Sequence, residues 1–213
     1  EHLYHPLSFL KNIHKKISVN TFHIFSVPNL IVILKKKYTN AINFEHTIFL
    51  DECLIDELLK ITGFKIIKKK YFKNDHSIFY ATKKINLQKN NLSKNYSFNK
   101  KLFQNYINFH LELVDKINKK ILNTNLNVYL FGAHVFSQYL INFGLNTSEI
   151  KCILDNDKKK QNKRLYGTNL KVFSPKILKK VKSGIVILRS GVYNKEIKKD
   201  IINKINKNII FWE

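Results

Sequence analysis

Two histidines and a carboxylate near the start of the chain could carry out proton transfer. In Glu45-His46 an imidazole, which accepts a proton near neutral pH, follows a carboxylate that could orient it. His2 is a second candidate, close to the first predicted helix. The alternatives are that Glu45-His46 caps the following helix or faces solvent, and that His2 forms part of a helix-entry surface. We expect no metal site, because no cysteine or carboxylate cluster accompanies His2 and His5.

A second group of candidates follows two apolar runs in the last third of the chain. The turn from Gly132 to His134 ends one run and opens a helical pattern, and backbone N–H groups at such a helix start can hold a phosphate. Asp155 ends the next run, where a carboxylate can accept ribose hydroxyls. Arg164 and Tyr166 could reach a diphosphate or a sugar. The alternatives are a tight turn without a ligand and an exposed charged loop.

Strands and helices alternate along most of the chain and must position these residues. The patterns predict helices that begin at about residues 6, 51, 98, 133, 174 and 194. Residues 64–71 and 77–82 read as a hairpin. Further strands are predicted at residues 21–27, 128–131, 150–154, 171–173, 185–188 and 209–212. On the long helix at 98–122, the predicted buried face comprises Leu102, Tyr106, Phe109, Leu113 and Ile117.

This alternation predicts an α/β fold with a parallel sheet and helices on its faces. The expected organisation is a partial α/β domain at residues 1–84, a linker and bridging helix at 85–122, and a complete small α/β domain at 123–213. The 44% hydrophobic content excludes a wholly disordered chain.

The formal net charge of +23 has a compositional explanation. Nearly all basic residues are lysines, spread in short runs among abundant asparagine and isoleucine, as A/T-rich codons would give; the arginines are Arg164 and Arg189. We therefore favour solvated lysine faces over a nucleic-acid partner. No apolar run approaches the ~20 residues of a membrane span, so no membrane partner is expected. The two cysteines are far apart, which favours a reducing cytoplasm.

The first 84 residues resemble the C-terminal half of a class I S-adenosylmethionine-dependent methyltransferase. The matching stretches, in order, are Glu1–Leu10 ("EH…P…FL"), Ser26–Asn29 ("VPN") and Gly63-Phe64 ahead of two β-runs. Asn43–His46 resembles the "YHEH" segment of the sugar-nucleotide C-methyltransferases. Residues 123–213 look like the second Rossmann-like domain of that family, with matches at Phe131–Ala133, Asp155–Asp157, Tyr166–Thr168 and Ser174-Pro175.

The resemblance implies S-adenosyl-L-methionine as cofactor and a nucleotide-linked keto-sugar as substrate, bound between the two domains. His46 would remove a proton next to the keto group, Glu45 would orient it or bind the sugar, and His2 would line the mouth of the site. Asn43 stands where the family has a tyrosine and cannot act as acid or base, so C-, O- and N-methylation stay open.

The family's zinc-binding domain and Gly-rich cofactor loop have no counterpart in this sequence, which also contains no methionine. We therefore expect a fragment of a methyltransferase that is inactive alone. The alternative function is a non-catalytic module that binds a nucleotide-sugar or another phosphorylated ligand.

Overall fold

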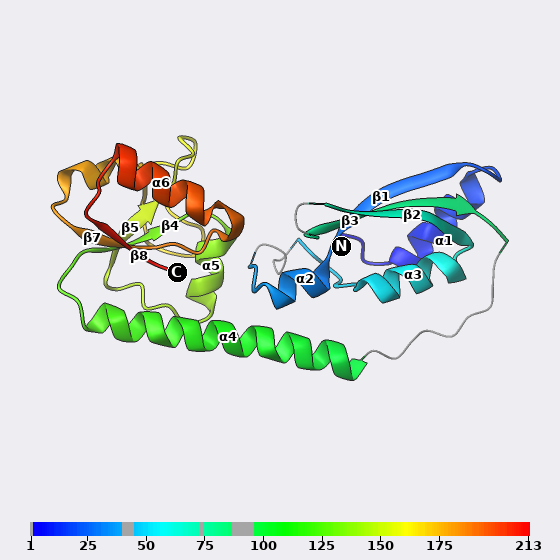
Figure 1. Cartoon of the computed structure of the whole chain (residues 1–213), viewed down its shortest axis with the longest axis horizontal. Helices are drawn as coiled ribbons and strands as arrows, with labels where there is room; N and C mark the ends of the chain where they lie inside the picture. Colours follow the sequence, from blue (N-terminus) through cyan, green and yellow to red (C-terminus); the bar gives the residue numbers. More distant parts are fainter. Residues whose placement is uncertain (1, 40–44, 73–74, 87–95) are drawn as a thin grey trace. The chain divides into compact units, whose positions relative to one another are not determined.

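The computed structural model describes residues 2–39, 45–72, 75–86 and 96–213. The chain divides into two compact units, residues 1–106 and 107–213, each with its own sheet (Figure 1). The predicted α/β fold is confirmed. The predicted domain boundaries at residues 84 and 122 stay predictions. Within the described ranges, no helix is both long and apolar enough to cross a membrane.

The first unit is a three-stranded antiparallel sheet with helices on one face. Asp51 begins the helix before the hairpin, because its carboxylate accepts a hydrogen bond from the Leu54 amide at 2.8 Å. The strand order is β1-β3-β2. The elements are α1 (Pro6–Lys16), β1 (Phe22–Pro28), α2 (Leu30–Lys35), α3 (Glu52–Ile61), β2 (Phe64–Phe72), β3 (Ser77–Lys84) and the first part of α4 (Tyr96–Leu122).

The two faces of this sheet differ in burial. On the covered face, Ile55 and Leu59 of α3 pack with Phe64, Ile78 and Tyr80, and α1 adds partly buried apolar side chains. The opposite face, which we call the outer face, follows from the strand register, because paired residues point to the same side. It carries Phe22, Ile24 and Phe79 together with Lys65, Lys68, Lys70 and Lys83.

The second unit is a five-stranded parallel sheet of Rossmann-like type. The strand order is β6-β5-β4-β7-β8, so the chain runs outward from β4 through β5 to β6 and then returns to the other side of β4. After the last part of α4, the elements are β4 (Val128–Phe131), α5 (Val135–Asn142), β5 (Ile150–Leu154), β6 (Val172–Phe173), η1 (Pro175–Lys180), β7 (Gly184–Ile187), η2 (Gly191–Tyr193), α6 (Asn194–Lys204) and β8 (Ile209–Trp212).

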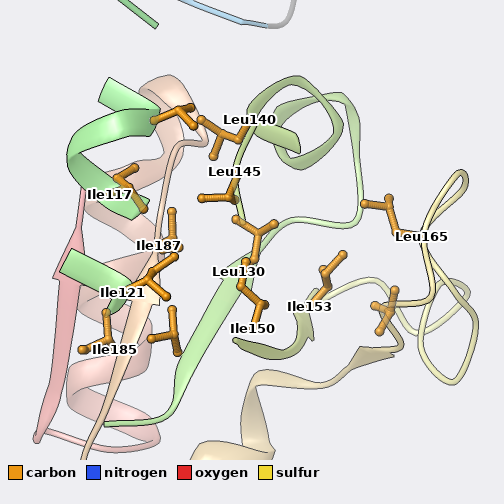
Figure 2. Packing of buried hydrophobic residues seen from close by; sticks show 13 residues of the cluster. Ile117, Ile121, Leu130, Leu140, Leu145, Ile150, Ile153, Leu165, Ile185 and Ile187 are labelled. Atoms are coloured by element: carbon orange, nitrogen blue, oxygen red, sulfur yellow. The ribbon is translucent and has the colours of Figure 1, made fainter. Parts of the chain in front are cut away.

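Helices cover both faces of this sheet, which explains why its strands are apolar at consecutive positions. On one face, Ile117 and Ile121 of α4 pack near Ile185 and Ile187 of β7, and Leu140 of α5 joins the same cluster (Figure 2). On the other face, residues of η1 and α6 pack against the alternate positions of the strands. The helices that follow β4 and β7 therefore lie on opposite faces.

The buried face of α4 differs from the predicted one. Phe109 and Leu113 are only half-buried, whereas His110 is completely buried and contacts the rings of Tyr139 and Phe143. The prediction was right for Tyr106 and Ile117, but it passed over His110, a polar residue at the correct helical spacing. The side chains that α4 buries are Tyr106, His110, Val114, Ile117 and Ile121.

Candidate functional site

The structure brings three of the predicted residues together in the first unit. His2 lies just before α1, and Glu45 and His46 lie ahead of the Asp51-capped α3. His2 Nδ1 donates a hydrogen bond of 3.0 Å to the backbone carbonyl oxygen of Glu45, since a carbonyl can only accept. The rings of His2 and His46 meet edge to face, with centroids 4.9 Å apart. Asn43 lies outside the described residues.

His46 stands at the rim of an apolar hollow. It is half-buried, and its ring lies 6.2 Å from that of Phe49. The hollow of about 30 Å³ is also lined by Val27 and Pro28, at the carboxyl end of β1. Pockets that bind small molecules and cofactors have volumes of about 300–1,000 Å³. The described residues around His46 therefore form a place for a proton-accepting side chain, but they do not by themselves hold an S-adenosyl cofactor.

A larger groove lies between α1, β1 and α3 of the same unit. Its volume is about 210 Å³, and it shares Val27 and Leu50 with the hollow beside His46. Its walls are mainly apolar, with His23 and Ser26 as polar members. Burial lowers the pKa of His23, so this imidazole is held in its neutral form. The groove therefore favours apolar contact over binding of an anion.

In the second unit, the glycine turn is closed by a carboxylate of the chain itself. Gly132 adopts φ 100°, and the next amide, that of Ala133, donates a hydrogen bond of 2.8 Å to Asp155 Oδ2. The other oxygen of Asp155 accepts the Asp157 amide at 2.8 Å, and Lys160 Nζ lies 3.3 Å from Oδ2. Asp155 is 8% exposed. These contacts favour the alternative of a tight turn without a ligand, in which Asp155 stabilises the turn and does not accept hydrogen bonds from a ribose.

The other predicted residues of this unit are exposed. His134 is the N-cap residue of α5, but its side chain makes no capping hydrogen bond to the helix. Arg164 and Tyr166 lie on a loop, where Arg164 Nη1 donates to Asn169 Oδ1 at 3.3 Å and Tyr166 is 88% exposed. This loop borders an open surface depression. All of these residues stay predictions as substrate-binding groups.

Two residues that the sequence analysis did not select lie at the end of β7. Ser190 is 5% exposed, and its Oγ lies 3.8 Å from the position that a Cβ on Gly132 would take. Arg189 places its guanidinium 5.8 Å from the centre of the Phe109 ring. These two residues come close to Gly132 only because β4 pairs with β7. The paired residues are nearly 60 positions apart, so no local sequence pattern could have shown that they are neighbours.

Comparison with protein families agrees with this architecture. The family model described as the C-methyltransferase C-terminal domain matches residues 84–211. The chain belongs to this family. The match covers the second unit as far as residue 211, and membership supports a methyltransferase function. The comparison with curated proteins gives no match.

Proposed function

We infer that the chain belongs to a methyltransferase that uses S-adenosyl-L-methionine and methylates carbon in a nucleotide-linked keto-sugar, with His46 as the general base. Such a donor supplies an electrophilic methyl group. The acceptor carbon must lose a proton before it can attack, and a positioned imidazole is suited to that step near neutral pH. Membership of the C-methyltransferase C-terminal domain family supports the class of reaction.

The observation that carries the assignment of His46 is its grouping with His2 and Glu45. The hydrogen bond from His2 Nδ1 to the Glu45 carbonyl fixes the neutral His2 ring as the Nδ1–H tautomer. The rings of His2 and His46 meet edge to face, so His2 holds His46 in position. In this proposal His46 removes the proton, while His2 is a positioning residue. Glu45 contributes its backbone oxygen to the same arrangement.

The experiment measures proton removal separately from methyl transfer. The full-length protein is incubated in D₂O with a nucleotide-linked keto-sugar, and deuterium uptake next to the keto group is followed by NMR. Transfer of a labelled methyl group is measured in parallel. The change His46→Gln keeps a polar side chain but removes the base. The rates of deuterium uptake and of methyl transfer should therefore both fall, typically by about 10²–10⁴-fold. A fall of less than about tenfold in either rate would be too small for the loss of a general base.

His5→Gln is the matched control, because His5 is an exposed histidine three residues from His2 and outside the proposed group. This variant should exchange deuterium and transfer methyl at the rate of the unchanged protein. Normal exchange by the His46→Gln protein would exclude His46 as the base. A methyl label found on oxygen or nitrogen would instead overturn the proposal of C-methylation. Whether His46 is the general base would then be decided by the deuterium exchange alone.

The keto-sugar substrate, the S-adenosyl donor and a cytoplasmic location stay proposals. Supporting the sugar assignment is the resemblance of Asn43–His46 to the sugar-nucleotide enzymes. The absence of a nucleic-acid partner likewise remains a prediction based on composition.

A further inference from the structure

The outer face of the first sheet divides into an apolar strip and a row of lysines. The strip consists of Phe22 and Ile24 of β1 and Phe79 of β3, which are 54%, 69% and 42% exposed, respectively. The lysine row runs along β2 and consists of Lys65, Lys68 and Lys70, all exposed. In the strand order β1-β3-β2, the strip therefore lies over two strands and the row along one side of it. Grouped apolar side chains that stay exposed mark an interaction surface.

The lysine row has no opposite charge beside it. On the same strand, Lys69 points to the covered face, where it pairs with Glu52 and Asp56 of α3. The lysines of the row point the other way and form no ion pair with any residue that the structure describes. The strands β1, β2 and β3 contain no acidic residue. A partner that complements this face therefore has to bring the negative charge.

The dimensions of the face match those of an α-helix. Strands lie about 4.8 Å apart and a helix with its side chains is about 10 Å wide, so a helix over β1 and β3 covers the strip and places one flank above β2. The lysines of the row oppose every second residue of β3, which spaces them by about 6.8 Å. A helical turn rises about 5.4 Å, so carboxylates on successive turns can face successive lysines.

The strip is better suited to apolar packing than to nucleic-acid binding. Single-stranded nucleic acids stack their bases on aromatic rings. Here Lys83 Nζ already lies 4.6 Å from the centre of the Phe22 ring, and Ile24, the most exposed member of the strip, has no ring. A second copy of the chain is also disfavoured, because its outer face would bring the same lysines against these.

We propose that the outer face docks an amphipathic helix of a partner protein, with the apolar side of the helix on the strip and an acidic flank against the lysine row. Amphipathic helices are bound in this way through apolar anchors spaced by one or two turns. The surface is formed by the first unit alone and is separate from the group of His2, Glu45 and His46. The proposal holds whether or not His46 is the general base.

Two fluorescently labelled synthetic peptides test the proposal on the 213-residue chain. Each is a helix of about 18 residues with leucines at i, i+3, i+4 and i+7. The acidic peptide carries glutamates along one flank, and the basic peptide carries lysines at the same positions. Fluorescence anisotropy in about 0.1 M NaCl should show binding of the acidic peptide and at least about tenfold weaker binding of the basic one. Additional NaCl should weaken the binding of the acidic peptide.

Variants of the chain locate the binding surface. Ile24→Glu removes an apolar anchor and adds a repelling charge, so it should weaken binding of the acidic peptide at least about tenfold. Replacement of all three lysines of the row by glutamine should weaken it about fivefold or more. The matched control replaces three exposed lysines of α1 and α3, namely Lys11, Lys16 and Lys60, by glutamine. It removes the same total charge away from the outer face and should change the affinity by less than about twofold.

Circular dichroism shows whether each variant is folded, and if Ile24→Glu does not fold, the two triple variants decide the question. Equal affinity for the acidic and basic peptides overturns the proposal, as do equal losses in the two triple variants or no binding of the acidic peptide. A thymidine oligonucleotide and phosphatidylserine vesicles are titrated in parallel. If either binds more tightly than the acidic peptide and is lost in the lysine-row variant, the face belongs to a nucleic acid or a membrane, and the proposal is likewise overturned.

Discussion

Replacement of Gly63 by alanine tests the packing of the first unit. Gly63 ends α3 with φ 82°, a left-handed conformation that side chains other than glycine rarely adopt. Its carbonyl accepts the Ile85 amide at 2.8 Å, and His14 Nε2 donates to the Ile85 carbonyl at 2.8 Å. A Cβ on Gly63 would lie 2.5 Å from His14 Nε2 and 2.9 Å from the Ile85 oxygen. The backbone and the histidine therefore meet where the new methyl group must go.

The expected cost has two parts. A left-handed conformation costs an L-residue about 1–2 kcal/mol, and a methyl group forced into a packed site adds about 1–3 kcal/mol. Gly63→Ala should therefore lower the free energy of unfolding of the first unit by about 2–5 kcal/mol. Adding His14→Ala removes the closest contact but leaves the Ile85 oxygen in place, so it should restore only part of the loss.

Gly144→Ala is the matched control, because Gly144 has φ 94° and no atom within 4 Å of the added Cβ. It should cost only the conformational part. Urea unfolding followed by circular dichroism measures both units, while fluorescence of Trp212, the single tryptophan, reports the second unit. Equal destabilisation by the two substitutions, each measured on its own unit, would refute the close-packing argument.

Two further predictions concern the same unit. Lys69 Nζ bridges Glu52 at 2.7 Å and Asp56 at 2.5 Å, so Lys69→Met should destabilise the unit by about 1–2 kcal/mol in urea unfolding. Lys70→Met, on the outer face, should change the free energy of unfolding little. If Lys69→Met and Lys70→Met destabilised the unit equally, the ion pairs of Lys69 would not be what stabilises the hairpin. Burial lowers the pKa of His23, so below about pH 6.5 the unfolded chain binds more protons than the folded one. Stability should therefore fall between pH 7.5 and 5, and less so in His23→Gln; identical pH profiles would contradict this assignment.

Local sequence patterns predicted the helices and strands better than the contacts between residues far apart in the sequence. The bounds of β4 and β5 match the prediction, because the four apolar residues of β4 end at Gly132, and β5, which is apolar except for Lys151, ends at Asp155. The short helix α2 was missed, since its apolar run, Leu30–Leu34, offers no polar alternation to set a helical period. The grouping of His2 with His46 required a contact across 44 positions, for which the sequence carried only the family resemblance.

Polar residues in buried positions were the hardest to predict. His110 has the correct helical spacing for the core, yet its residue type indicates a surface or a site. Ser190 is unremarkable in sequence and gains its meaning only from the strand order, which places it beside Gly132. The role of Asp155 in closing its own turn depends on side-chain direction, which spacing alone does not determine.

The lysines on the outer face of the first sheet oppose the association of one copy of the chain with another. Phe22, Ile24 and Phe79 are exposed there, on or beside the edge strand β1. Exposed apolar strands at an edge tend to pair with other copies and aggregate. The lysines of the same face, Lys65, Lys68, Lys70 and Lys83, give every copy the same charge at that surface, so two such faces repel each other. Raising the ionic strength screens this repulsion, so the charge of these lysines keeps the folded chains apart only in dilute salt.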